Sequence, residues 1–355
     1  MITFALDKQM CLMKNPFVTN GYAGAEYFCD RVQETASLRE LLLNENNVAL
    51  ISPRRLGKTD LIWHVFDDAE IRRTHYCFVV DIYATKNLGD FVNMLGKAVM
   101  DELRPKGKRE WEKFITLDEI FTYLNRADKP CLVAIDEFQQ ITRYGDDTVE
   151  ATLRTYVQRC TNAHFIFSGS QRHMMNGMFT SPSRPFYQAV SIMNLQPLDM
   201  KVYTDFCADK FEQAGKHLDP AVVSALYQRF DAVTSYMHRI LNVLYSRTGE
   251  GETCTVSMVD EAIDFILRMS SDTYESLYYQ MPEKQRMLFL AIAKEGKASE
   301  VTGGKFINKH KLLSASSVSS ALKGLLEKDF ITIDKNVYRV YDQFFSLWLA
   351  FKGMI

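Results

Sequence analysis

The sequence lacks the cysteine and histidine spacings that build structural zinc sites. Its seven cysteines are scattered, and no two of them form a CxxC pair: Cys11, Cys29, Cys77, Cys131, Cys160, Cys207 and Cys254. Structural zinc sites need such pairs or a matching Cys/His spacing, so we expect none. Scattered thiols are typical of a reducing compartment, and we therefore expect reduced cysteines and a cytoplasmic location.

Long hydrophobic runs and an excess of one charge are also missing. No run approaches the roughly 18 apolar residues that cross a bilayer, and the first residues lack the pattern of a signal peptide, so we expect no membrane partner. The 42 Lys and Arg residues nearly balance the 44 Asp and Glu residues, for a formal net charge of -2. This balance argues against a surface coated for non-specific nucleic-acid binding, although the sum would hide a local basic face.

The sequence does contain an alternation of short apolar runs and amphipathic stretches over its first part. Amphipathic segments such as 88–103 and 116–127 separate runs rich in Val, Ile and Phe. This alternation predicts an open, parallel α/β sheet covered by helices. The runs that we interpret as strands buried on both faces are 47–52, 76–83, 131–138, 164–170 and 189–198.

Beyond residue 199 the strand pattern gives way to helical periodicity. In the segment 257–269, apolar residues recur at the spacing of one helix face, from Val259 to Leu267. Near residue 273 the pattern changes to three helices followed by a hairpin. The length of 355 residues allows two or three domains. We therefore expect an α/β core over 1–199, a helical domain over 200–272 and a third domain over 273–355.

The segment ISPRRLGKTDL (51–61) carries the phosphate-loop pattern GxxxxGK[ST] with one departure, because Ser52 stands at the first glycine. Gly57 allows backbone N–H groups to turn onto phosphate oxygens. Lys58 is expected to meet the β- and γ-phosphates as a catalytic cation, and Thr59 to ligate Mg²⁺ at the helix N-terminus. The residues expected to bind ATP are Ser52, Pro53, Arg54, Arg55, Leu56, Gly57, Lys58, Thr59 and Asp60.

Paired carboxylates end the apolar run CLVAIDEF (131–138). Asp136 is expected to hold Mg²⁺, and Glu137 to orient or deprotonate an attacking water. The run HFIFSGS (164–170) places Ser168 and Ser170 at the end of another strand, and Ser168 is the candidate for a catalytic hydrogen bond to the γ-phosphate or the water. The order of these motifs predicts ATP and Mg²⁺ as cofactors, and it supports binding more directly than efficient hydrolysis.

The segments ISPRRLGKTDL, VAIDEFQQI and FIFSGSQRHMM together resemble the archaeal-type ATPase family, a STAND-related group of P-loop ATPases within the AAA+-like branch. The segment NPF…YFCDRVQE and the closing YRVYDQFFSLWLAF resemble the elements that flank its core. The resemblance implies a sheet with strand order 5-1-4-3-2, a helical lid and a carboxy-terminal winged helix. A nucleotide-dependent homo-oligomer of this chain is one expectation. Four arginines are candidate arginine fingers, and the choice among them stays open: Arg154, Arg159, Arg172 and Arg184.

The carboxy-terminal segment shows the order of a winged helix. Helices are expected over 282–296, 303–313 and 315–331, the last capped by Ser316, followed by a hairpin that turns at 334–336. The third helix is the element that usually enters a major groove. Residues 301–328 hold five lysines and one glutamate, which predicts a modest basic face. The lysines expected to meet a duplex are Lys305, Lys309, Lys311 and Lys323, and a protein partner for this domain is an equal alternative.

Two functions remain open from the sequence. The first is an ATP-driven switch whose winged helix contacts double-stranded DNA or a protein. The second is a DNA-binding regulator with a degenerate, structural nucleotide site. A small-molecule kinase is disfavoured, because Glu137 beside Asp136 suits activation of water better than transfer to a hydroxyl acceptor.

Overall fold

The five apolar runs form one parallel sheet. The computed structural model describes residues 14–29, 31–103 and 115–355. The strands lie in the order β2-β3-β4-β1-β5, and each neighbouring pair is parallel. Counted from the other edge, this is the predicted order 5-1-4-3-2, which is therefore confirmed. The strands are β1 (Val48–Ile51), β2 (Tyr76–Asp81), β3 (Cys131–Asp136), β4 (Ala163–Gly169) and β5 (Ser191–Asn194).

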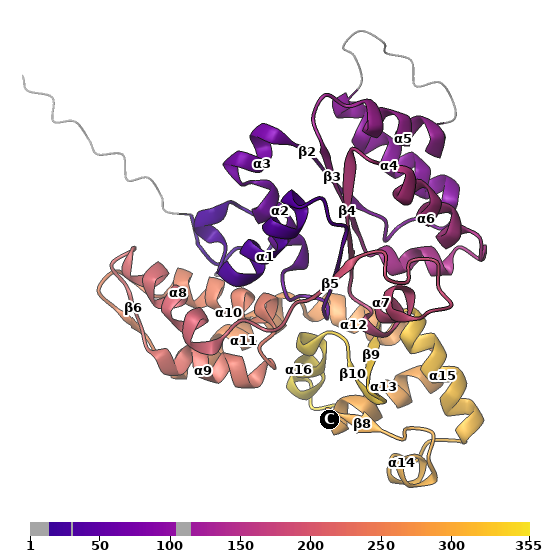
Figure 1. Cartoon of the computed structure of the whole chain (residues 1–355). Coiled ribbons are helices and arrows are strands. Elements are labelled where there is room, and N and C mark those ends of the chain that lie inside the picture. The colour runs from indigo at the N-terminus through magenta and orange to yellow at the C-terminus, as the bar shows by residue number, and fades with distance from the viewer. Residues whose placement is uncertain (1–13, 30, 104–114) are drawn as a thin grey trace, which may run out of the picture. The chain divides into compact units, whose positions relative to one another are not determined.

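Helices cover both faces of this sheet (Figure 1). Successive strand residues point to opposite faces, so Val48 and Leu50 join one hydrophobic core while Ala49 and Ile51 join the other. The first core is covered by α1 (Val32–Leu43), α2 (Lys58–Phe66) and α3 (Ala69–Thr74). The second is covered by α4 (Leu88–Leu103), α5 (Leu117–Arg126), α6 (Val149–Arg159) and α7 (Arg172–Thr180). The α/β layers predicted from the sequence are confirmed.

The run 189–198 differs from the prediction of a strand buried on both faces. Only β5 (Ser191–Asn194) is a strand, its residues alternate between half-buried and exposed, and the Ile192 side chain is 40% exposed. The reason is its place at the edge of the sheet, where it pairs with β1 alone.

A helical subdomain follows the sheet, built from α8 (Met200–Glu212), α9 (Pro220–Arg229) and α10 (Thr234–Arg247). It also contains a parallel pair of two-residue strands, β6 (His217–Leu218) and β7 (Thr253–Cys254), which the sequence analysis did not predict. The segment before α1 packs against this subdomain. Phe17 is fully buried, and the Asn15 side chain donates a hydrogen bond of 2.8 Å to the carbonyl of Asn242 in α10.

The chain divides into two compact units, Met1–Cys254 and Thr255–Ile355. The division into 1–199, 200–272 and 273–355 stays a prediction. The second unit begins with α11 (Ser257–Met269) and α12 (Ser271–Gln280). In α11 the apolar face expected from the spacing, which includes Val259 and Leu267, is buried.

The rest of the second unit has the helix and strand order of a winged helix. Its helices are α13 (Glu283–Glu295), α14 (Gly304–Lys309), α15 (Ala315–Glu327) and α16 (Gln343–Phe351). Its strands form a small antiparallel sheet, β8 (Ala298–Ser299), β9 (Ile331–Asp334) and β10 (Val337–Val340), in the order β8-β10-β9. The turn between β9 and β10 places Lys335 and Asn336 in the left-handed region, with φ of 46° and 64°.

The cap of α15 corrects the sequence analysis. The helix ends at Glu327 rather than 331, and the side chain that caps its N-terminus belongs to Ser314 rather than Ser316. Ser314 has extended backbone and accepts a hydrogen bond from the N–H of Ser317 at 3.3 Å, which is the geometry of an N-cap.

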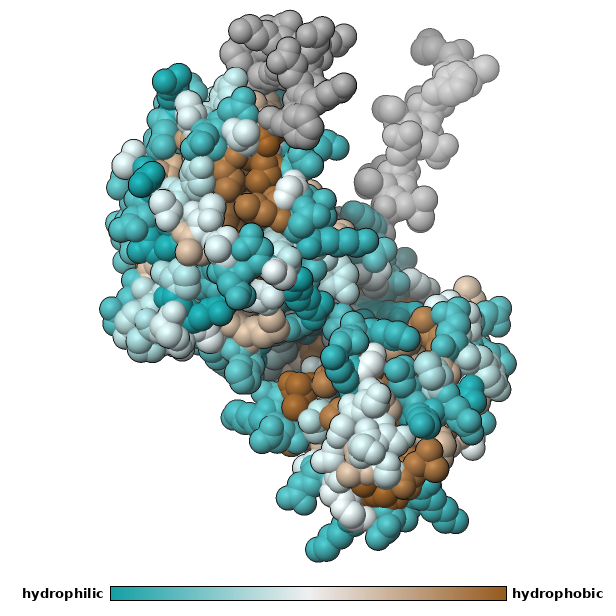
Figure 2. All heavy atoms as spheres, turned by 90° about the vertical axis from the view of Figure 1, so that its right-hand side faces the viewer, coloured by the Kyte–Doolittle hydropathy of each residue, from teal (hydrophilic) through white to brown (hydrophobic). Residues whose placement is uncertain are grey.

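No helix within the described ranges is long and apolar enough to cross a membrane. On the face shown in Figure 2 the side chains are mainly hydrophilic, and the hydrophobic ones gather in small areas.

Candidate functional site

The phosphate-loop pattern lies where strand β1 ends and helix α2 begins. Gly57 directly precedes α2 with φ of 84°, and Arg55 is also left-handed with φ of 67°. A side chain at Gly57 would strain this conformation, which explains the glycine. Ser52 is fully buried; its N–H donates to the carbonyl of Gly169 at 3.3 Å, and its hydroxyl donates to the carbonyl of Pro53 at 2.9 Å.

Lys58 lies at the first position of α2 and extends its amine back over the loop. Its Nζ donates to the carbonyls of Ser52 and Pro53, each at 3.3 Å. Burial lowers the pKa of Lys58, and the nearby carboxylates of Asp136 and Glu137 oppose that shift. The loop therefore holds a buried amine beside two carboxylates, as a site that binds phosphates and a cation requires.

Thr59 meets the second motif directly. Its hydroxyl donates to Asp136 Oδ2 at 2.5 Å, and the other oxygen of Asp136 accepts the N–H of Glu137 at 2.9 Å. No cluster of three or more acidic, histidine or cysteine side chains suited to a metal lies in the described ranges. Mg²⁺ usually takes one or two protein ligands together with phosphate oxygens and waters, so the adjacent Thr59 hydroxyl and Asp136 carboxylate fit this ion.

The carboxylate of Glu137 is held by side chains from three segments. Glu137 is left-handed, with φ of 56°. Its Oε2 accepts hydrogen bonds from Gln139 Nε2 and from Ser170 Oγ, the latter at 2.8 Å. Arg54 Nε donates to Ser170 Oγ at 3.1 Å, and Arg54 Nη2 lies 4.0 Å from Glu137 Oε2.

Among the described contacts it is therefore Ser170, rather than Ser168, that reaches Glu137. Ser168 is fully buried in β4, and its hydroxyl has no hydrogen-bond partner in the described part of the chain. Gln139 and Ser170 were not assigned a role from the sequence, because the sequence pattern that could have indicated one is weak. Both are common polar residues near strand ends, and only the fold brings them to one carboxylate.

Arg31 is a further residue that sequence reasoning missed. It is buried, with 4% exposed, and its guanidinium donates to the carbonyl of Leu56 at 2.8 Å and to that of Gln196 at 3.0 Å. An ion pair of 2.8 Å with Glu34 offsets its charge. Arg31 therefore joins the phosphate loop to the chain that leaves β5. Sequence reasoning missed it because the identity of the residue does not indicate whether an arginine is buried or exposed.

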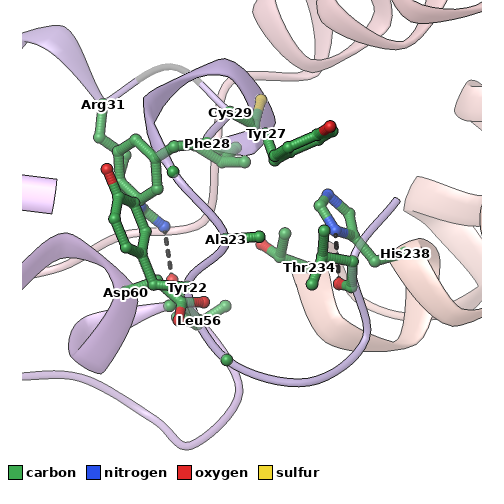
Figure 3. A pocket seen from close by; sticks show the side chains of 15 residues that line it. Tyr22, Ala23, Tyr27, Phe28, Cys29, Arg31, Leu56, Asp60, Thr234 and His238 are labelled. Carbon is green, nitrogen blue, oxygen red and sulfur yellow. Dashed lines mark hydrogen bonds between the residues drawn. The ribbon is translucent and has the colours of Figure 1, made fainter. Parts of the chain in front are cut away.

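A cavity lies beside the phosphate loop, within the first unit (Figure 3). It is open to solvent, and the space between its walls, open solvent included, is about 480 Å³. The segment before α1 supplies most of its wall, including Tyr22 and Tyr27, and α10 supplies Thr234 and His238. Asp60, predicted to bind ATP, lies in the first turn of α2 and lines this cavity, and burial raises the pKa of its carboxyl.

The remaining loop residues tie the site to α10. Arg55 Nη1 donates to the hydroxyl of Tyr236, and the Arg55 carbonyl accepts the N–H of Ser235 at 3.4 Å. Leu56 is buried. Of the four candidate arginine fingers, Arg184 is ion-paired with the buried Glu150.

Comparisons with known proteins agree with this architecture. The family model of an ATPase domain predominantly from Archaea matches residues 28–240, and that of a probable winged helix domain matches residues 272–351. No curated protein sequence matches the chain significantly.

Among solved structures, a Walker-type ATPase of Pyrococcus abyssi is similar, with a TM-score of 0.67 and 16% identity over 94% of this chain and 99% of that chain. The ORC1 protein of Aeropyrum pernix in complex with DNA has a TM-score of 0.55 and 16% identity over 92% of this chain and 93% of that one. The ORC2 protein of the same organism, in its ADP form, has a TM-score of 0.57 and 13% identity over 96% and 97%. At these identities the likeness shows the fold.

The resemblance predicted from the sequence is confirmed, because the first model covers more than half of the chain. The chain belongs to the family defined by the ATPase domain predominantly from Archaea.

Proposed function

We propose that this protein is an ATP-binding, Mg²⁺-dependent ATPase that works as a molecular switch. One observation carries the proposal: the 2.5 Å hydrogen bond from Thr59 to Asp136 joins the phosphate loop to the paired carboxylates. Lys58 directly precedes Thr59 in the sequence, Glu137 directly follows Asp136, and both carboxylates act on the Lys58 amine. ATPases of the phosphate-loop class need these four groups at one point.

The chain's own residues account for binding and for activation of water. The loop N–H groups and the Lys58 amine bind the phosphate oxygens, and the α2 N-terminus favours their negative charge. When bound, Mg²⁺ held by Thr59 and Asp136 would neutralise charge on the β- and γ-phosphates. Glu137 accepts the proton of the attacking water. Ser170 and Gln139 hold its carboxylate in place, which makes them positioning residues.

The cavity beside Gly57 is proposed as the site of the nucleotide base. It is next to the phosphate loop, and aromatic side chains such as Phe28 supply part of its wall. Ligand pockets are commonly mostly apolar, with a few polar groups that fix orientation.

Replacing Glu137 with Gln tests the function. The amide preserves the shape of the side chain but cannot accept the proton, so MgATP binding should stay within a few-fold while phosphate release falls at least 100-fold. Glu40→Gln, on the exposed face of α1, is the matched control and should change neither quantity.

Hydrolysis by Glu137→Gln at the wild-type rate would contradict the role of Glu137. Tight ATP binding by a wild type that releases no phosphate would favour the regulator with a structural nucleotide site instead.

We further propose that the second unit contacts double-stranded DNA or a protein partner. Lys305 and Lys311 are exposed and form no ion pair within the described residues, which supports a basic contact surface. Lys309 forms an ion pair with Glu295 at 2.6 Å, and Lys323 forms one with Glu327 at 3.8 Å. These two lysines therefore contribute less positive charge to the contact surface. A cytoplasmic location and a nucleotide-dependent homo-oligomer complete the proposal, on the support of the thiol pattern and of the family.

A further inference from the structure

His238 is a polar residue that the proposed chemistry at the phosphates does not use. It lies on α10 and lines the cavity beside the phosphate loop, yet only 9% of the residue is exposed. Its ring packs edge-on against Phe17 and stacks on Tyr203, with centroids 5.8 Å apart in both pairs. These aromatic contacts fix the orientation of the imidazole.

The hydrogen bond at Nδ1 determines which ring nitrogen carries the proton. Nδ1 lies 3.4 Å from the carbonyl oxygen of Val18. A carbonyl oxygen can only accept, so Nδ1 must be the donor, and in a neutral ring Nε2 then has a lone pair and accepts. Burial lowers the pKa of His238 to about 4, so the ring carries a single proton at neutral pH.

Nε2 is buried and has no hydrogen-bond partner within the described residues, and the same holds for the hydroxyl of Thr234 one turn earlier. Both residues line the cavity, and Figure 3 shows the second nitrogen of His238 turned away from the Val18 bond. A buried acceptor without a donor is costly. A ligand that brings an N–H group to Nε2 would remove that cost.

We propose that His238 determines the base specificity of the site, by accepting a hydrogen bond from the exocyclic amino group of adenine. The inference rests on the proposed function, which puts the base in this cavity. Adenine carries an amino donor at its 6-position, whereas guanine and hypoxanthine carry an acceptor oxygen there. That oxygen would face the lone pair of Nε2. The Thr234 hydroxyl can donate or accept, so it binds a base without selecting one.

A series of analogues tests this on the wild-type protein, without any substitution. MgATP, purine riboside triphosphate, inosine triphosphate and N6,N6-dimethyl-ATP share the phosphates and the sugar, and they differ at the 6-position. Calorimetric titration should show ATP binding about tenfold tighter than purine riboside triphosphate, which lacks the amino group. Inosine triphosphate should bind more weakly still, because its acceptor oxygen at the 6-position would face the acceptor Nε2. The dimethyl analogue has no N–H to donate at the 6-position, so its affinity should be at least tenfold below that of ATP.

His238→Leu removes the acceptor and should bring ATP and purine riboside triphosphate to within about twofold of each other. The matched control is His217→Leu, an exposed histidine of the same unit, which should keep the wild-type ratio. Equal wild-type affinities for ATP and purine riboside triphosphate would overturn the role of His238 and leave the ATPase proposal standing. If none of the four nucleotides binds, both proposals are wrong.

Discussion

Ser52 stands where the phosphate-loop pattern has glycine, and its backbone explains why a side chain is tolerated. The left-handed positions of the loop are Arg55 and Gly57, and Ser52 is not among them. Its hydroxyl donates a hydrogen bond to the carbonyl of Pro53. The backbone at Ser52 therefore does not require a glycine, whereas the left-handed backbone at Gly57 favours one.

Lys58→Ala is the residue-scale prediction. The change removes the buried positive charge that faces the loop carbonyls and the two carboxylates, so MgATP affinity should fall at least tenfold in a calorimetric titration. Ser52→Gly is its control and should stay within a few-fold of the wild type. An unchanged affinity in Lys58→Ala would contradict the assignment of this loop to phosphates.

At the scale of elements, Arg31 connects two parts of the first unit that lie far apart in the sequence. Its guanidinium bonds to the carbonyls of Leu56 and Gln196, and both contacts are made by a nearly buried side chain. Arg31→Met should leave these carbonyls without their donor and lower the free energy of unfolding by about 2–4 kcal/mol, measured by urea denaturation.

The matched control for Arg31→Met is Arg39→Met on helix α1, which begins at the residue after Arg31. Arg39 pairs with Asp68 and Glu70 near the surface, with 34% of its side chain exposed, so its loss should cost less than about 1 kcal/mol. If both variants lose the same free energy of unfolding, the buried contacts of Arg31 do not contribute more to stability than a surface ion pair.

The same scale shows what the sequence could predict. The positions of β1 to β4 and of helices α4 and α5 along the chain followed from apolar runs and amphipathic spacing, which are local signals. The order of the strands in the sheet was implied by the family resemblance, and the motifs assigned Thr59 and Asp136 to one Mg²⁺ without predicting their direct hydrogen bond. β5 was predicted as buried because its composition is apolar, and only its edge position explains its exposure. Arg31, Ser170 and His238 take their roles from contacts across more than 30 residues of sequence, where no local pattern exists.

At the scale of the whole molecule, the net charge of -2 leaves DNA binding to a local surface. If Lys305 and Lys311, which form no ion pair within the described residues, neutralise one phosphate each, the log–log dependence of duplex affinity on salt should have a slope of about -2. Changing both to Gln should flatten that slope and leave MgATP affinity unchanged, since they belong to the other compact unit. Fluorescence anisotropy with a labelled duplex measures the slope.

The control for the salt titration is the pair Lys309→Gln and Lys323→Gln, whose charges already face glutamates. This double variant should change the salt slope less than the double variant of Lys305 and Lys311 does. A wild type without salt-dependent duplex binding would rule out DNA and direct the search to a protein partner.

The packing of Phe17 and Asn15 against α10 has a consequence for the order in which the chain folds. Asn15 and Asn242 are 227 positions apart, and the segment before α1 and helix α10, which their hydrogen bond joins, both supply residues to the cavity wall. During synthesis the segment before α1 leaves the ribosome long before α10 does. Its contacts with α10 therefore cannot form until after the residues of the sheet have been made. Closing so long a loop is slow relative to local contacts. The cavity is therefore expected to be among the last parts of the first unit to assemble, and a nascent chain should acquire nucleotide affinity only after α10 has emerged.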